Sequence, residues 1–94
     1  MFSEEMHRAV YASFGLVGAP LPHRERRRRR LAITSLFLGR PVTTFKDLTD
    51  ADYDRLRETF IPTWQPGERI DLEQPAMLRL KWLMHHLPES EALR

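Results

Sequence analysis

Cysteine is absent from this 94-residue chain, and so is any long apolar stretch. Without cysteine there is no disulfide framework, no thiolate metal site and no cysteine nucleophile. No apolar run approaches the roughly 20 residues that a membrane-spanning helix needs. The first residues also lack the basic start of a secretory signal, because Glu4 and Glu5 stand where positive charge would be. We therefore expect a cytoplasmic protein with no membrane partner.

Sequence motifs of catalysis and metal binding are missing as well. No G-x-S-x-G, H-E-x-x-H, P-loop or G-x-G-x-x-G pattern occurs. His85 and His86 are adjacent, so on a helix their rings point about 100° apart and cannot chelate one ion as an i, i+4 pair does. A chain of this length builds one small core without a deep cleft. We expect no enzyme, no metal site and no cofactor.

The chain is rich in arginine, and the arginines are clustered. The formal net charge is only +2, but residues 1–40 carry +5 and residues 41–94 carry −3. The surplus lies in residues 23–30, whose sequence is His-Arg-Glu-Arg-Arg-Arg-Arg-Arg. A helix that starts with these residues places cations where the helix dipole disfavours them by about 0.3–1 kcal/mol each. A local rule broken without a local gain indicates function.

Apolar periodicity and capping signals predict an all-α fold, a small bundle of three to four short helices. One domain is expected over residues 1–88, followed by a frayed tail over residues 89–94. The expected helices run from a Ser3 cap to a stop at Gly15, over residues 23–38 with Gly39 as the cap, over residues 50–60 after a Thr49 capping box, and from Pro75 to a stop at Pro88.

A loop with proline, glycine and tryptophan precedes the last helix. The sequence Gln65-Pro-Gly-Glu68 suits a type II turn, and we expect a folded loop pinned by Trp64. The expected core comprises Val10, Phe14, Leu31, Ile33, Leu36, Phe37, Tyr53, Leu56, Phe60, Leu80 and Leu83.

The arginine run favours binding to a nucleic acid backbone. Guanidinium groups donate paired hydrogen bonds to phosphate oxygens without reading sequence. The candidate nucleic-acid-binding residues are Arg24, Arg26, Arg27, Arg28, Arg29, Arg30 and Arg40. Residues 26–30 cover more than one helical turn, so one or two arginines must point toward the core side. Tyr11 and Phe14 belong to the first helix and no aromatic residue lies near the run, so single-strand binding by stacking is not expected.

Two other interpretations of the run stay open. The arginines could meet an acidic surface of another protein, or they could be neutralised within the domain. The acidic residues for such neutralisation are Asp47, Asp50, Asp52, Asp54 and Glu58. A protein partner would use tryptophan and methionine as anchors, because these residues are enriched at interface centres. The candidate partner-binding residues are Trp64, Trp82 and Met84, and a homodimer is also open.

Residues 24–60 resemble a small helical module of actinobacterial and actinophage proteins. In that module a basic helix ends in Gly-Arg-x-Val, here residues 39–42, and Asp-Leu-Thr-x-x-Glu opens the next helix, here residues 47–52 with Asp52 in place of Glu. The structural positions shared with the module are Gly39, Arg40, Thr44, Asp47 and Thr49.

The module occurs in or beside phage single-strand-annealing recombination proteins and other DNA-processing products. The resemblance therefore implies a phage or prophage origin, the host-cell cytoplasm as location and a DNA-associated setting, and it transfers no catalytic residue. The leading hypothesis is a small non-enzymatic phage-type accessory protein that binds nucleic acid, DNA before RNA. The alternative is an adaptor or inhibitor that binds a host or phage protein.

Overall fold

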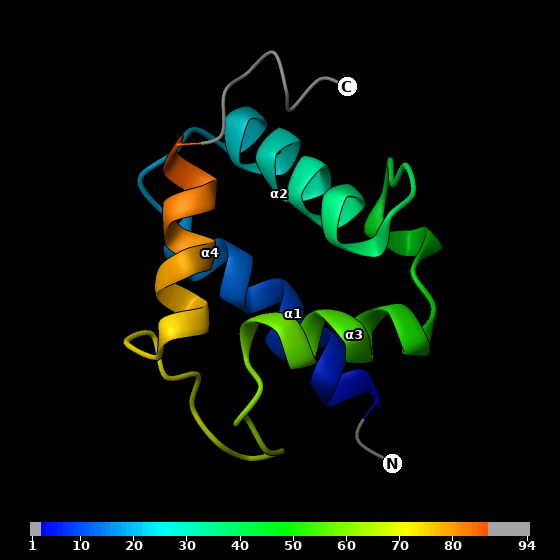
Figure 1. The fold of residues 1–94 in the computed structure, drawn as a ribbon, viewed down its shortest axis with the longest axis vertical. Helices are drawn as coiled ribbons and strands as arrows, with labels where there is room; N and C mark the ends of the chain where they lie inside the picture. The colour runs from blue at the N-terminus through cyan, green and yellow to red at the C-terminus, as the bar shows by residue number, and fades with distance from the viewer. Residues whose placement is uncertain (1–2, 87–94) are drawn as a thin grey trace.

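A computed structural model describes residues 3–86 and shows an all-α bundle (Figure 1). The elements are α1 (Ser3–Val17), α2 (His23–Leu38), the 3₁₀ turn η1 (Phe45–Asp47), α3 (Asp50–Phe60) and α4 (Pro75–His86). Within residues 3–86 there is no β-strand, and no helix is both long and apolar enough to cross a membrane. The predicted fold class is confirmed. The expected stop at Pro88 and the tail over residues 89–94 lie outside the described residues.

Glycine ends one of the two helices for which the sequence predicts a glycine stop. Gly39 adopts a left-handed conformation with φ 73°, and its N–H donates to the Ser35 carbonyl at 2.9 Å, which ends α2 as expected. The predicted stop of α1 at Gly15 is wrong, because the helix continues to Val17. Val17 is buried, so two further residues of helix bring an apolar side chain into the core.

Threonine caps open both η1 and α3, and the cap at Thr49 is the predicted one. Thr44 precedes η1, and its hydroxyl accepts from the backbone N–H of Lys46 at 3.2 Å. Thr49 opens α3 with a reciprocal capping box: its hydroxyl accepts from the Asp52 N–H at 3.1 Å, and its own N–H donates to the Asp52 carboxylate at 2.9 Å. These bonds satisfy donors that the helix itself leaves unpaired.

The core agrees with the sequence except on α2. The predicted residues that are buried are Val10, Phe14, Ile33, Tyr53, Leu56, Phe60 and Leu80, while Leu31, Phe37 and Leu83 are partly buried against them. The prediction for Leu36 is wrong, because its side chain is 65% exposed. The buried stripe of α2 runs through Arg30, Ile33 and Thr34, and Leu36 lies roughly a third of a turn away from it.

The helix arrangement determines what the arginine run meets. α1 packs against α3 and α4, and α2 packs across α3 and α4. In Figure 1 the start of α2 lies beside the end of α4, whereas the start of α3 lies near the opposite end of α2. The arginine-rich end of α2 is therefore remote from the acidic start of α3.

The loop between α3 and α4 is folded around a tryptophan, as predicted. Trp64 is buried, and its indole N–H donates to the Glu68 carbonyl at 3.1 Å. The Glu68 N–H closes the turn on the Gln65 carbonyl at 3.0 Å, with Gly67 at φ 87°. This positive φ at the third turn position is the feature that the type II turn requires of glycine.

Candidate functional site

Three helix ends converge at the arginine run. Arg29 donates from its guanidinium to the Met84 carbonyl in the last turn of α4 at 3.3 Å and to the Glu25 carboxylate at 3.3 Å. At the same place the His85 ring nitrogen donates to the Val17 carbonyl, at the end of α1, at 2.7 Å. Carbonyls at helix C-termini carry partial negative charge. The ends of α1 and α4 therefore offset part of the cation penalty at the start of α2.

Arg30 is the inward-pointing arginine that the sequence required. It is only 8% exposed, and its guanidinium lies over the Tyr11 ring at 4.6 Å and the Phe45 ring at 5.5 Å. Burial lowers the pKa of Arg30 from its ordinary value. The aromatic faces compensate the buried cation by cation–π attraction. Arg30 therefore serves the packing of α2 on α1 and is not at the surface where a phosphate would bind.

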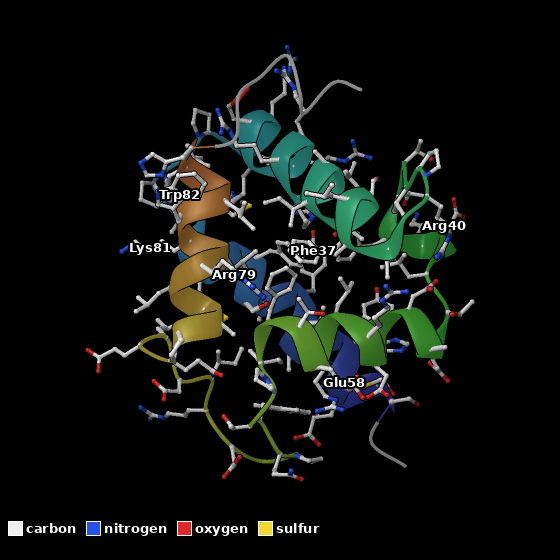
Figure 2. The ribbon with its side chains drawn as sticks, viewed as in Figure 1. Phe37, Arg40, Glu58, Arg79, Lys81 and Trp82 are labelled. Atoms are coloured by element: carbon white, nitrogen blue, oxygen red, sulfur yellow. The ribbon has the colours of Figure 1, made fainter. Side chains whose placement is uncertain are left out.

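The remaining arginines of the run lie at or near the surface. Arg24 and Arg27 are exposed, and Arg27 also donates to the Thr43 carbonyl at 3.3 Å. Arg26 and Arg28 are half-buried, and Arg28 pairs with Glu25 at 3.1 Å. Figure 2 shows nitrogen-tipped side chains projecting from the start of α2 away from the other helices. The predicted nucleic-acid-binding set is thus divided between surface arginines and arginines that hold the fold.

Arg40, the last residue of the predicted binding set, has a structural partner. Its guanidinium forms a two-pronged ion pair with the carboxylate of Asp52. The hydrogen bonds from Arg40, followed by the capping bond from the Thr49 backbone, lower the pKa of Asp52 to about 2. Arg40 therefore ties the end of α2 to the capping box of α3, and it lies at the other end of α2 from the arginine run.

The acidic side chains of α3 pair with groups outside the arginine run. Besides Asp52 with Arg40, the pairs are His7–Asp50 (2.7 Å), Arg57–Asp54 (2.9 Å) and Arg57–Glu58 (3.6 Å). Among the residues that the structure describes, no ion pair joins the run to α3. Neutralisation of the arginines by the acidic helix, one of the open interpretations, does not occur in this arrangement.

Charge is segregated between the helices. α2 and α4 together carry eight basic side chains and one acidic side chain, a formal net charge of +7. The whole chain carries +2, so the remaining residues carry −5. Arg24 and Arg26 to Arg30 supply six of these eight cations, so positive charge gathers at the start of α2, which lies beside the end of α4 (Figure 1). Such a field attracts polyanions over the distance of a Debye length.

Comparisons with family models, curated proteins and solved structures give no match. The resemblance of residues 24–60 to the phage module therefore stays a prediction.

Of the three predicted partner-binding residues, two are buried and one is exposed. Trp64 is 5% exposed and Met84 is fully buried, so both belong to the core. Trp82 is 58% exposed, and in Figure 2 it points away from the bundle. Only Trp82 is placed to contact a partner directly.

The expectation that no aromatic group lies near the arginine run is wrong, because the rings of Tyr11 and Phe45 lie beside Arg30. Trp82 is an exposed aromatic residue on a neighbouring helix. It lies on the last turns of α4, and the bond from Arg29 to the Met84 carbonyl holds that part of α4 against the start of α2. Its sequence distance from the run conceals this proximity. The spacing of Leu80 and Met84 could have shown that Trp82 faces outward, because it lies two residues from each on a helix whose other face is buried.

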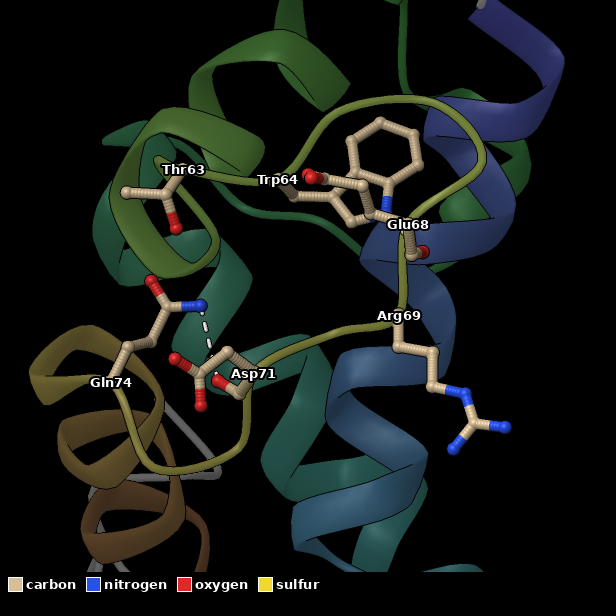
Figure 3. Close-up of a pocket in the computed structure, with 6 residues that line it drawn as sticks. All are labelled: Thr63, Trp64, Glu68, Arg69, Asp71 and Gln74. Carbon is tan, nitrogen blue, oxygen red and sulfur yellow. Dashed lines mark hydrogen bonds between the residues drawn. The ribbon is translucent and has the colours of Figure 1, made fainter.

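The loop before α4 forms an open hollow of about 490 Å³ with polar walls (Figure 3). The Glu68 carboxylate there accepts from the Gln65 N–H at 2.8 Å, and the Asp71 carboxylate accepts from the Glu73 N–H at 3.0 Å. Both acids are engaged in holding the loop, and Arg69 points away from the hollow. Among the described residues no cluster of three metal-ligating side chains occurs. The side chains that line the hollow therefore do not form an arrangement typical of a catalytic site.

Proposed function

We propose that the protein is a small, non-enzymatic accessory protein that binds the phosphate backbone of nucleic acid through the surface arginines at the start of α2. The proposal rests on the distribution of charge. The helices α2 and α4 together carry a formal net charge of +7, whereas the whole chain carries +2. Charge segregated in this way creates one polyanion-binding end on a nearly neutral protein. The phage-type origin and the host-cell cytoplasm form part of the same proposal.

The binding is expected to be electrostatic and independent of sequence. Arg24 and Arg27 are exposed, and Arg26 and Arg28 extend from the same two turns with partly exposed side chains. Three phosphate contacts on a duplex would give a salt slope of about −2.7, which is roughly a 40-fold loss of affinity between 50 and 200 mM salt. Binding of this kind positions a protein on nucleic acid without selecting a base sequence.

A charge-matched pair of double variants tests the proposal. Arg24→Gln with Arg27→Gln removes two exposed cations at the start of α2, whereas Arg55→Gln with Arg69→Gln removes two exposed cations elsewhere. In a mobility-shift titration at low salt, the first variant should bind more weakly and with a shallower salt slope. The second variant should bind like the wild type, although its net charge equals that of the first variant. Equal binding by both variants would refute the proposed surface.

The second candidate is an adaptor whose partner is an acidic protein surface. It is favoured by one observation, the exposure of Trp82 at 58% beside the basic end. An adaptor would retain its partner after nuclease treatment and lose it on Trp82→Ala. A nucleic acid binder would lose co-purifying material on nuclease treatment, and this result separates the two functions.

A further inference from the structure

We infer that Trp82 is a base-stacking platform and that the nucleic acid held at the basic end is single-stranded. This inference rests on the proposed function and specifies its ligand. It reverses the expectation from the sequence, which placed no aromatic group beside the arginines.

The first support is the geometry of the indole itself. The rings of Trp82 and His86 are stacked with centroids 4.8 Å apart and an angle of 10° between their planes. The Nδ1–H of His86 donates to the Trp82 carbonyl at 3.0 Å, which holds the imidazole in place. One face of the indole is thus covered, yet the residue is 58% exposed. The exposed area belongs to the other face and the edges, where a flat ring can add to the stack.

The second support is the charge around this platform. α4 contains no acidic residue, and the exposed Lys81 is the chain neighbour of Trp82. The start of α2, where Arg24 is exposed, is held against the last turn of α4 by the bond from Arg29. Cations and an exposed aromatic ring therefore lie at the same end of the bundle (Figure 1). Single-strand binding proteins combine these two groups, with the cations on the backbone and the ring under a base.

The platform discriminates between strand states by access. In a duplex each base is stacked above and below and paired at its edge, so an indole on the protein surface reaches no base face. In a single strand the base faces are free, and stacking works with any base because each has a π face. The arginines alone would bind a duplex and a single strand alike, so a preference for the single strand must come from Trp82.

Fluorescence anisotropy with two labelled probes tests this inference. One probe is an oligothymidine of about 15 nucleotides, within the site sizes of single-strand binders, and the other is a blunt hairpin duplex with as many phosphates. The wild type should prefer the oligothymidine, and Trp82→Ala should weaken that binding by about 5- to 150-fold. Trp82→Phe keeps a ring and should retain most of the affinity. Leu78→Ala, which trims another exposed apolar side chain on α4, is the matched control and should bind like the wild type.

The outcomes separate this inference from the proposed function. If Trp82→Ala binds both probes as the wild type does, the stacking platform is refuted, while loss of binding in the Arg24 and Arg27 variant would still support the arginine surface. If the wild type binds neither probe at low salt, both proposals fail. Tryptophan fluorescence adds a direct signal: oligothymidine should quench the wild type and leave Trp82→Phe nearly unchanged, because the remaining Trp64 is buried. Equal quenching in both proteins would contradict the stack.

Discussion

Gly18 is the position where a single added methyl group should disturb the arginine end most. A Cβ there would lie 2.7 Å from the Met84 methyl carbon, 3.0 Å from the Phe14 carbonyl oxygen and 3.1 Å from the Arg26 Cγ. The methionine methyl group can swing away, but the carbonyl oxygen is backbone and Cγ is near the base of its side chain. We expect Gly18→Ala to lower the free energy of unfolding by about 1–3 kcal/mol, the usual cost of overpacking.

Gly15 supplies the matched control for the same substitution. It lies within α1, and a Cβ there would meet nothing within 4 Å. Gly15→Ala should therefore raise the free energy of unfolding by about 0.5–1 kcal/mol through helix propensity. Thermal unfolding followed by circular dichroism measures both, since 1 kcal/mol moves the midpoint by about 4–8 °C in a domain of this size. If Gly18→Ala melts at or above the wild-type temperature, the close approach of α1, α2 and α4 is refuted.

Three further predictions concern single side chains. Arg30→Met should leave urea stability unchanged or higher, because a buried cation is replaced by an apolar chain of similar length, and a loss of oligonucleotide binding would contradict its structural role. The pKa of Asp52 is lowered to about 2 by Arg40, so its carboxylate stabilises the fold above pH about 4 and that stability is lost as the pH falls toward 2. Asp52→Asn should then lower the urea midpoint at pH 7 but not at pH 2, and an equal loss at both would refute the ion pair. Leu36→Gln should change the free energy of unfolding by less than about 0.5 kcal/mol, since Leu36 is 65% exposed. A large drop in the thermal unfolding midpoint would instead show that Leu36 belongs to the core.

Helix boundaries with specific cap chemistry could be predicted from the sequence, and the others could not. Gly39 and Thr49 each supply a bond that only an end can use, so α2 and α3 have the expected bounds at those residues. Gly15 makes no such bond. It has open space around it, and a glycine of this kind is tolerated within a helix, so it does not specify a helix end. Whether α1 continued past it depended on burial of Val17, which is a tertiary contact and leaves no local signal.

The candidate site was predictable in composition but not in arrangement. The count of five consecutive arginines required an inward one, and Arg30 is that residue. Which side chains would receive it depended on how α1 and η1 pack, and Tyr11 and Phe45 are distant from each other in sequence. The nearness of Trp82 to the run has the same origin, because it follows from the contact between α2 and α4. Apolar periodicity identifies the buried face of a single helix, but it does not show which other helix end that face contacts.

The arginines of the run have two roles, which explains why cations are tolerated at the start of a helix. Some of them support the fold, and others remain on the surface. Arg29 binds a carbonyl at the end of α4, and Arg30 is sheltered by two aromatic rings. These two arginines serve the fold, so their unfavourable placement on the helix dipole is compensated. Arg24 and Arg27 lie on the surface one turn apart, and Arg27 also donates to the Thr43 carbonyl. Like charges at i, i+3 repel on a helix, and the anionic ligand that we propose would offset this repulsion.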